Sequence, residues 1–537
     1  MIKLQGKGVS AGIAFGTVRF LKRASAPVEK RVIDNIEAEL ERFENARRLA
    51  CDQLDELSDK TAAKLGAENA ALFEVHKMML QDTDYTDPII ELIKTESVCA
   101  EYAVNTAGSR LALDFAEMDD EYMKARSADV YDISRRVIDV LSGADGGEGA
   151  TARAIYAADD FSPSETAQMD KDKTLAMISR GGSANAHSAI FARTMAIPAI
   201  IGFGEFLSDD FAGKEAALDG GEGVLYIEPE PGVIRALKEK QQSQERERTE
   251  LEGYRGKPTL TKNGRKVKLY ANIGSVSDAE SALAGDAEGV GLFRSEFLYL
   301  EKDDYPDEEY QFENYKKVLE RMGGREVVIR TLDIGADKQA AYFKLPAEEN
   351  PALGLRAIRI CLTRPALFKT QLRAIYRASV FGNASIMFPM INSLSDLTRA
   401  KKIAAEVRAE LAEKKIAFKD VPIGIMVETP ASVIIADLLA READFFSIGT
   451  NDLTQYTLAC DRENEAIAEF CDTHHEAVLR MIRMTAQAAH NAGIWCGICG
   501  SLGGDLALTR DFLDMGIDEL SVEPPSILKL RKRIAEV

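Results

Sequence analysis

The chain has 537 residues, of which 46% are hydrophobic and 29% are charged, and its net charge is −20. A chain of this length and composition is typical of a globular protein with about three domains. The excess of acidic residues excludes a nucleic-acid or anionic-membrane surface, because both require concentrated Lys and Arg.

Nothing in the sequence predicts export or membrane insertion. No run of about 18 or more apolar residues is present, and the N-terminal stretch MIKLQGKGVSAG lacks the apolar core of a signal peptide. The seven cysteines are odd in number and irregularly spaced, unlike a secreted disulfide framework. We therefore expect a cytoplasmic protein.

The first 230 residues predict an α/β domain that is interrupted by helices. Residues 6–20 and 150–230 mix short β-branched runs with Gly-rich turns, whereas residues 28–144 are almost free of Gly and Pro. In that helical region apolar residues recur at steps of three and four: Ile33, Ile36, Leu40, Phe43, Ala50, Leu54 and Leu57. We expect residues 1–27 and 145–230 to form one α/β domain, with residues 28–144 inserted as a helical bundle.

The remainder of the chain predicts a connecting helix and a barrel. Residues 231–258 are polar, with Pro231 near the start and Gly253 and Gly256 near the end, as in an exposed helix. In residues 259–537 helical segments alternate with short apolar strands: KVKLYANIG, GVGLFRS, VVIRTLDIG, IMFPMIN, PIGIMVE, FFSIGTND and IWCGICGS. This alternation predicts a (β/α)8 barrel within a multidomain α/β protein.

Charged or reactive residues stand at the ends of the predicted barrel strands: Arg294, Arg330, Glu428, Asn451, Asp452 and Cys499. The C-terminal strand ends of such barrels build the active site. Arginines at this position suit a phosphate or a carboxylate, which the guanidinium group binds through two hydrogen bonds. The alternative is that they close the barrel end through salt bridges with Glu296 and Asp333. Arg356 and Arg462 extend the pattern and favour ligand binding.

Glu428 and Asp452 predict a magnesium site. Two carboxylates, completed by substrate oxygens and water, form the oxygen shell that Mg²⁺ prefers. A metal there would neutralise phosphate charge. The alternative is two solvated acids on loops.

The C-x-x-C formed by Cys496 and Cys499 has three interpretations. It can be a redox pair, or half of a zinc site completed by Cys471, His474 and His475. Neighbouring residues of a strand face opposite ways, however. A single cysteine at the strand end, Cys499, that acts as an acid therefore fits better.

His187 is the candidate nucleophile. In ISRGGSANAHSAIFARTMAIPAIIG a Gly-rich turn leads His187 to the start of a helix that ends before Pro198. Free N–H groups and the helix dipole stabilise negative charge there, so a phosphorylated imidazole is favoured, and a histidine nitrogen is a competent nucleophile. The other histidines are interpreted as packing or surface residues: His76, His474, His475 and His490.

With these residues in view, the chain resembles Enzyme I of the bacterial phosphoenolpyruvate:sugar phosphotransferase system over essentially its whole length. The matching stretches are GIAFG, SPSETAQ, HSAIFARTMAIPAI, AEGVGLFRSEFLYL, VVIRTLDIGADK, ENPALGLRAIRI, IMFPMIN, GIMVETP, DFFSIGTNDLTQYTLACDR and GICGSLGGD. Related dikinases and phosphoenolpyruvate synthase share these modules, but their nucleotide-grasp module has no room here.

The resemblance implies a mechanism. Phosphoenolpyruvate binds at the barrel mouth with Mg²⁺ held by Glu428 and Asp452, and its phosphate and carboxylate are bound by Arg294, Arg330, Lys338 and Arg462, with Arg356 and Asn451 assisting. His187 attacks the phosphorus in line, and Cys499 protonates the released enolate to give pyruvate. The swivelling phosphohistidine domain then carries the phosphoryl group to the carrier protein HPr, as the first step of sugar uptake.

The resemblance also implies partners. The segment ALFEVHKMMLQD, with Phe73 and Met79, is similar to the HPr-docking region of the family. The family forms homodimers through its barrel.

The sequence departs from the family at several places. Many members have T-S-H before the nucleophile, where this chain has Asn185-Ala186-His187, so we expect Thr166 to supply the missing hydroxyl. The N-terminal S-P-G-I-A appears as Ser10-Ala11-Gly12. His474-His475-Glu476 and Glu523-Pro524-Pro525 are also unusual, and we expect neither to touch the barrel residues named above.

Three other functions fit parts of the sequence. A nitrogen-related paralogue with another carrier usually has an added N-terminal sensory domain, whereas this chain begins with the phosphohistidine domain. A degenerate scaffold would bind partners without transferring phosphate, and the complete set of candidate residues speaks against it. A regulatory protein that uses Cys471 and the C-x-x-C would bind stoichiometric zinc.

Overall fold

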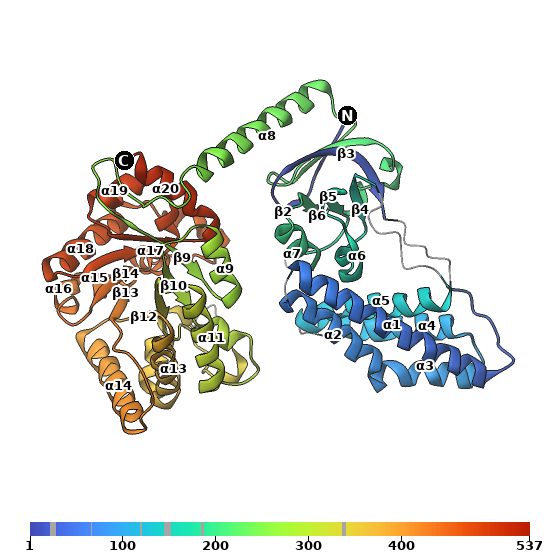
Figure 1. Ribbon diagram of the computed structural model, residues 1–537, viewed down its shortest axis with the longest axis horizontal. Helices are drawn as coiled ribbons and strands as arrows, with labels where there is room; N and C mark the ends of the chain where they lie inside the picture. Colours follow the sequence, from blue (N-terminus) through green and yellow to red (C-terminus); the bar gives the residue numbers. More distant parts are fainter. Residues whose placement is uncertain (22–27, 66, 119–120, 144–151, 184–186, 336–339) are drawn as a thin grey trace. The chain divides into compact units, whose positions relative to one another are not determined.

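The computed structural model describes residues 1–21, 28–65, 67–118, 121–143, 152–183, 187–335 and 340–537. The chain divides into two compact units, Met1–Arg246 and Glu247–Val537 (Figure 1). No helix of the described residues has an 18-residue stretch apolar enough to span a membrane.

The first unit is built on an eight-stranded sheet with the order β1-β8-β7-β3-β4-β5-β6-β2. Its strands are β1 (Ile2–Gln5), β2 (Lys7–Ser10), β3 (Ile13–Phe20), β4 (Ala154–Ala158), β5 (Thr174–Ser179), β6 (Ala199–Ile201), β7 (Glu215–Asp219) and β8 (Val224–Ile227). The central strands β3 to β6 are parallel, and the outer pairings are antiparallel. Every residue of β4 is buried, as expected for a parallel strand covered on both faces.

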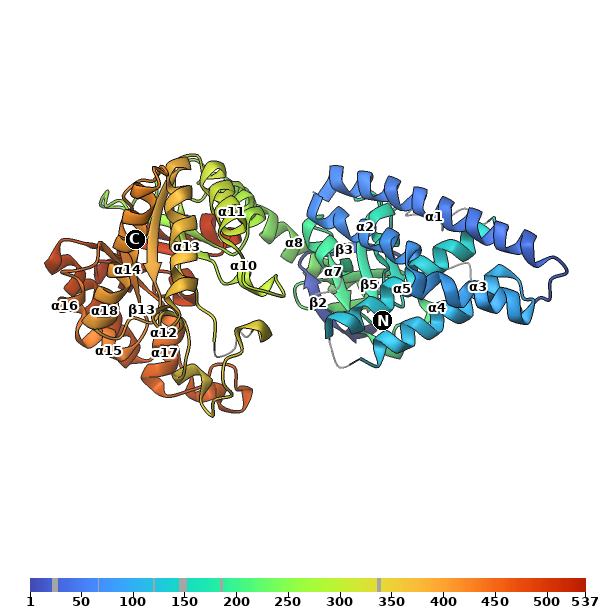
Figure 2. The ribbon, with the colours of Figure 1, turned by 90° about the horizontal axis from the view of Figure 1, so that it is seen from below.

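A helical bundle is inserted between two neighbouring strands of this sheet. β3 and β4 pair in parallel, with Val18 opposite Ile155. Five helices lie between these strands in the chain: α1 (Ile36–Leu65), α2 (Ala67–Gln81), α3 (Thr83–Glu96), α4 (Ala100–Ala116) and α5 (Glu121–Leu141). Their apolar faces meet in one core, and α1 runs along the bundle (Figure 2). The predicted helical insertion is therefore present.

Three further helices follow the bundle in the chain, and the last of them extends past the end of the first unit at Arg246. α6 (Pro163–Gln168) and α7 (His187–Thr194) lie on the side of the sheet that faces the bundle (Figure 1). α6 starts with a capping box between Ser162 and Glu165, which fixes its first turn. α8 (Pro231–Glu252) buries only Leu237 among its residues, as its polar sequence predicts for an exposed helix.

The second unit is a closed barrel of eight parallel strands, as predicted. They are β9 (Lys268–Ile273), β10 (Val290–Arg294), β11 (Glu326–Arg330), β12 (Asn383–Phe388), β13 (Ile423–Val427), β14 (Phe445–Ile448), β15 (Trp495–Ile498) and β16 (Glu519–Val522). The sequence analysis named seven of them. β16 was missed because it has four residues, ELSV, and half of them are polar.

Helices surround the barrel. They are α9 (Val276–Ala284), α10 (Phe297–Leu300), α11 (Glu308–Arg321), α12 (Ile358–Thr363), α13 (Pro365–Ala378), α14 (Leu394–Glu413), α15 (Pro430–Ile434), α16 (Ala436–Leu439), α17 (Thr450–Leu458), α18 (Glu476–Ala492), α19 (Thr509–Asp514) and α20 (Ile527–Ala535).

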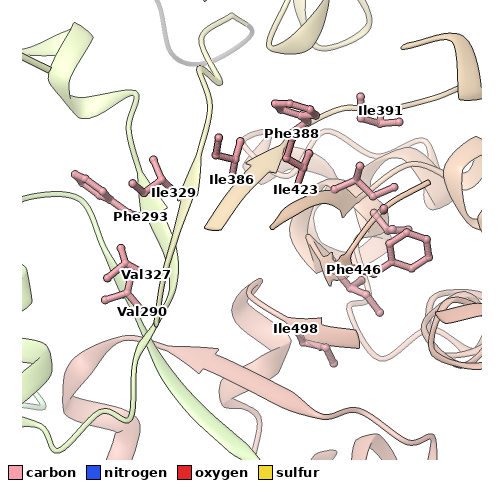
Figure 3. Packing of buried hydrophobic residues seen from close by; sticks show 14 of the residues in the cluster. Val290, Phe293, Val327, Ile329, Ile386, Phe388, Ile391, Ile423, Phe446 and Ile498 are labelled. Atoms are coloured by element: carbon pink, nitrogen blue, oxygen red, sulfur yellow. The ribbon is translucent and has the colours of Figure 1, made fainter. Parts of the chain in front are cut away.

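Alternation along the strands separates two cores. Residues of one phase, such as Phe293, Ile329 and Phe388, point out and pack under the helices (Figure 3). Residues of the other phase, such as Val328 and Met426, fill the barrel interior. Because side chains alternate along a strand, the phase of each strand decides which residues at its end face the barrel axis.

We predict that Phe388→Ala lowers the free energy of unfolding of the barrel by about 3–5 kcal/mol. Phe388 is fully buried and its ring packs edge-on against Phe368. Urea unfolding can be followed by the fluorescence of Trp495, the single tryptophan, which lies in the barrel. The control Phe470→Ala, at a side chain that is 61% exposed, should leave the midpoint nearly unchanged. Equal midpoints for both variants would contradict this assignment of the core.

Candidate active site

The barrel brings most of the predicted residues to one end. Arg294 and Arg330 are the last residues of β10 and β11, and Glu428 and Cys499 directly follow β13 and β15. Side chains two positions apart on a strand face the same way. Arg294, Arg330 and Glu428 each follow an interior residue by two positions, and Cys499 itself belongs to the interior cluster, so all four face the barrel axis. Asn451 and Asp452 were predicted at a strand end, but they stand in the first turn of α17.

Arg330 lies at the centre of a buried network of charges. Its Nη2 donates to Glu296 Oε1 at 2.5 Å, and its Nη1 pairs with Asp333 Oδ2 at 3.0 Å. Asp333 also pairs with Arg356 Nη2 at 3.0 Å. Burial lowers the pKa of both arginines, but Asp333 and the other nearby acids raise it far above the usual value. Both guanidinium groups are therefore permanently charged, and the salt bridges of Arg330 with Glu296 and Asp333 are present.

Each of these two arginines also has a buried donor with no partner among the described residues. The Nε atoms of Arg330 and Arg356 are buried and have no hydrogen-bond partner within the described part of the chain. Buried donors in native proteins nearly always have a partner, so such groups suit an anionic ligand.

Arg294 has a different partner from the one predicted. Its Nη2 donates to Glu523 Oε1 at 3.0 Å, so the expectation that Glu523 touches no barrel residue is wrong. Glu523 follows β16 in the inward phase, and the sequence analysis did not identify that strand. The side chains of Arg294 and Glu523 are 34% and 59% exposed, so solvent weakens this pair.

Glu428 and Asp452 are buried neighbours, so their interpretation as solvated loop acids is wrong. Glu428 Oε1 accepts from the backbone N–H of Met390 at 2.6 Å. Burial, with the charges of Asp452 and Asp333, raises the pKa of Glu428 to about 8. A Cβ at Gly449 would lie 2.8 Å from Glu428 Oε2, so a side chain larger than that of glycine would crowd this oxygen.

This pair of carboxylates fits a divalent metal. Like charges held together in a buried site favour a cation between them. Among the described residues no group of three Asp, Glu, His or Cys side chains forms a metal site. Two carboxylates leave the rest of a divalent ion's shell to ligand oxygens and water.

Asn451 and Arg462 lie beside the carboxylates. Asn451 Oδ1 accepts from the backbone N–H and the hydroxyl of Ser501, at 2.9 and 2.6 Å. Arg462 Nη1 lies 3.7 Å from Asp452 Oδ1. The sequence analysis missed Tyr456, whose hydroxyl accepts from Arg356 Nη1 at 3.0 Å. Its position four residues after Asp452 on α17 was the available signal.

Cys499 is a buried thiol inside the barrel. Burial raises its pKa to about 12, although contact with the Ser447 hydroxyl lowers it. The thiol therefore keeps its proton at neutral pH. Cys496, in contrast, packs in the outer core between the barrel and its helices.

This separation excludes the zinc and redox interpretations of the C-x-x-C. Its two sulfur atoms lie on opposite sides of β15. The two histidines of the predicted zinc site have other contacts: His474 Nε2 lies 2.6 Å from Asp505 Oδ2, and His475 Nδ1 accepts from the N–H of Ala477 at the start of α18.

The nucleophile candidate stands at a helix start, as predicted. His187 is the first residue of α7. Its side chain, Asn185-Ala186 and Lys338 lie outside the described residues. The hydroxyl of Thr166 donates to the Pro163 carbonyl at 2.8 Å, within α6. A hydrogen bond from this hydroxyl to the His187 imidazole stays a prediction.

The predicted docking segment on α2 needs a correction. Phe73 is buried in the bundle core and Met79 is half-buried, so Phe73 has no surface for a partner. Met78 is 66% exposed and is the apolar side chain that this part of α2 presents. His76, interpreted as a packing residue, is fully buried and lies 3.1 Å from Asp129 Oδ1.

Comparisons with known proteins agree along the whole chain. Residues 248–537 match the family model of the PEP-utilising enzyme, PEP-binding domain. Residues 5–126 match the N-terminal model of PEP-utilising enzymes, and residues 150–223 match their mobile domain.

Curated relatives are similar over nearly their full length. The phosphoenolpyruvate-protein phosphotransferase of Priestia megaterium is 40% identical over 538 residues, which are 100% of this chain and 94% of that protein. The protein of the same name from Bacillus subtilis (strain 168) is 40% identical over 100% of this chain and 95% of its own. The protein of the same name from Haemophilus influenzae is 40% identical over 99% of this chain and 94% of its own length.

We predict that divalent metal binding depends on pH through Glu428. With a pKa of about 8, Glu428 is mostly protonated at pH 7, and the ion must displace that proton. Below pH 8 the affinity should fall by up to about tenfold per pH unit, with release of a proton, and above pH 8 both effects should vanish. Calorimetric titration of Mn²⁺ in buffers of different ionisation enthalpy measures both.

The matched variant for this titration is Glu428→Gln, which carries no proton to displace. It should bind Mn²⁺ weakly at every pH. A parent affinity that stays constant from about pH 6 to pH 8 would contradict the prediction.

Proposed function

We propose a mechanism for a chain that belongs to the phosphoenolpyruvate-protein phosphotransferase family of PEP-utilising enzymes. The protein is a transferase that moves the phosphoryl group of phosphoenolpyruvate, and enzymes of this family require a divalent metal. The observation that carries the mechanism is the barrel mouth, where permanently charged arginines, two carboxylates and a protonated cysteine converge.

Phosphoenolpyruvate binds at this mouth as an anion. Arg330 and Arg356 offer buried charge, and each has an Nε donor with no partner among the residues that the structure describes. Arg294 and Arg462 supply further positive charge at the rim, and the family resemblance adds Lys338 and Asn451. Glu428 and Asp452 would hold Mg²⁺, which would neutralise charge on the phosphate and on the developing enolate. Bound substrate therefore replaces some of the water around the charged side chains of the barrel mouth.

His187 accepts the phosphoryl group. A nitrogen of its imidazole attacks phosphorus, the bond between phosphorus and the enol oxygen breaks, and the enolate of pyruvate remains. The start of α7 supports this role, because helix N–H groups favour a phosphorylated side chain.

Cys499 completes the first half-reaction. Its thiol gives a proton to the methylene carbon of the enolate, which becomes the methyl group of pyruvate. The pKa of about 12 supports a donor that stays loaded at neutral pH. The inward phase of β15 supports its direction toward the barrel axis.

The second half-reaction hands the phosphoryl group to HPr. For this step we keep the predicted division: residues 1–27 and 145–230 as the swivelling domain, 28–144 as the HPr-binding insertion, 231–258 as the connecting helix and 259–537 as the barrel. The exposed Met78 on α2 supports a docking surface on the insertion.

We also propose a homodimer formed through the barrel. Ile434 and Leu438, on the adjacent helices α15 and α16, are 65% and 41% exposed. Apolar side chains exposed together support a surface that a second copy covers. A cytoplasmic location remains a prediction from the sequence.

We expect His187→Ala to abolish phosphorylation of the protein. The parent, incubated with labelled phosphoenolpyruvate and Mg²⁺, should gain label that is acid-labile and base-stable and that passes to added HPr. His475→Ala, which changes a surface histidine, should keep the label. Label on His187→Ala would assign another acceptor. No label on the folded parent with metal would favour a degenerate scaffold.

We expect Glu523→Gln to lower the KM for phosphoenolpyruvate. Glu523 competes with the substrate for Arg294, and an exposed ion pair contributes up to ~1 kcal/mol, so KM should fall by up to about fivefold. Steady-state pyruvate formation measures the change. The control Glu413→Gln, at an exposed residue ending α14, should leave KM unchanged. A raised KM would mean instead that Glu523 positions Arg294 for the substrate.

A further inference from the structure

The barrel interior below Cys499 contains a carboxyl group that the mechanism does not use. Glu519, the first residue of β16, is fully buried. Neither of its carboxyl oxygens has a hydrogen-bond partner among the described residues. A buried carboxyl group without partners is costly, so its presence in a barrel interior needs a reason.

The register of three strands brings this carboxyl group to the same inner face as Ser447. Ser447 pairs with Gly497, and Gly497 pairs with Glu519, so the three lie side by side on the inner face. A Cβ at Gly497 would overlap Glu519 Oε2. The carboxyl group therefore leans over the glycine that separates it from Ser447.

Ser447 in turn lies beside Cys499. Its hydroxyl lowers the pKa of the thiol through a side-chain contact, although it lacks the geometry of a full hydrogen bond. Cys499 stands two residues after Gly497 and faces the same interior. Glu519, Ser447 and Cys499 thus form a path of neighbouring polar side chains on the inner face, although no hydrogen bond joins Glu519 to Ser447 among the described residues.

The other end of the path lies near solvent. Lys268 pairs in register with Glu519 across β9 and β16, and its side chain is 34% exposed. Its Nζ lies 3.0 Å from Glu326 Oε2, which also accepts from the Tyr270 hydroxyl at 2.9 Å. Burial holds the pKa of Glu519 far above its usual range, with Lys268 opposing and Glu326 adding to the shift. Burial therefore favours the neutral, protonated form of Glu519.

We propose that Glu519 returns a proton to Cys499 through Ser447 after each protonation of the enolate. The proposal rests on the donor role of Cys499 in the proposed function. Cys499 loses its proton to the methylene carbon and becomes a thiolate. Ser447 gives its hydroxyl proton to the sulfur and receives the proton of Glu519, and the Glu519 carboxylate takes a proton from water at the Lys268 end. Glu519 acts only through Cys499 and never touches the substrate.

The test separates proton supply from phosphoryl transfer. The full-length protein is incubated with phosphoenolpyruvate, ¹⁴C-pyruvate and Mg²⁺ in D₂O, and two rates are measured. Exchange of ¹⁴C into phosphoenolpyruvate counts complete reversals, and mass spectrometry counts deuterium in the pyruvate methyl group. In the parent, the relay exchanges the Cys499 proton with solvent, so deuterium enters at each reversal.

Glu519→Gln keeps the shape of the side chain but has no acidic proton, and Ser447→Ala removes the link. In both variants Cys499 returns the proton that it has just removed. Deuterium per ¹⁴C exchange should therefore fall about fivefold or more, while the ¹⁴C exchange itself changes by less than about twofold. Ser385→Ala, which removes another interior hydroxyl, bonded to Glu326, should leave the ratio unchanged.

Two outcomes overturn the relay. If both variants show the same ratio of deuterium entry to ¹⁴C exchange as the parent, Cys499 is reprotonated from the barrel mouth. An equal fall of both rates would mean that Glu519 and Ser447 have only a structural role. Cys499→Ala tests the premise separately, because deuterium entry at the parent rate in that variant would refute the donor role of Cys499 itself.

Discussion

The closed parallel barrel is the constraint on which the candidate site depends. Parallel strands that close on themselves bring all their carboxyl ends to one mouth, and alternation along each strand sends every second side chain toward the axis. A shift of one residue in any strand would exchange the inner and outer cores, turning Arg330 or Glu428 into the helix layer. The outer apolar core thus holds the charged residues in place.

Charge balance inside the mouth explains how ionised groups persist there. Asp333 forms ion pairs with both Arg330 and Arg356. Asp452 Oδ2 lies 3.6 Å from Arg356 Nη2. Buried charges are tolerated when they are paired, yet the Nε donors of Arg330 and Arg356 have no partner in the described ranges of the chain. Glu428 lies in the same network, where burial and the charges of Asp452 and Asp333 raise its pKa more than Arg330 and Arg356 lower it. The network is therefore organised for a charged ligand and a metal together, which is what phosphoryl transfer from phosphoenolpyruvate requires.

Sequence patterns predicted the elements well where periodicity was strong. The helical insertion, the polar helix after Pro231 and the barrel are all present, and seven barrel strands were recognised as apolar runs. Strand β16 was not recognised, so the roles of two residues at its ends, Glu519 and Glu523, were not predicted. The pairing of Arg294 with Glu523 joins residues 229 positions apart, and Glu519 became visible only once β16 was placed beside β15. Phe73 was included in the segment that resembles the docking region, but three-dimensional packing buries it.

By itself, the sequence determined the residue types of the chemistry, the strand–helix alternation and the family, because these are properties of local pattern and of long ordered matches. Only the tertiary structure decided which side of β15 each cysteine occupies, which acid each arginine meets and which carboxyl group lies in the barrel interior. The physical reason is that burial and charge pairing are set by strand phase and barrel closure, which join residues from distant parts of the chain.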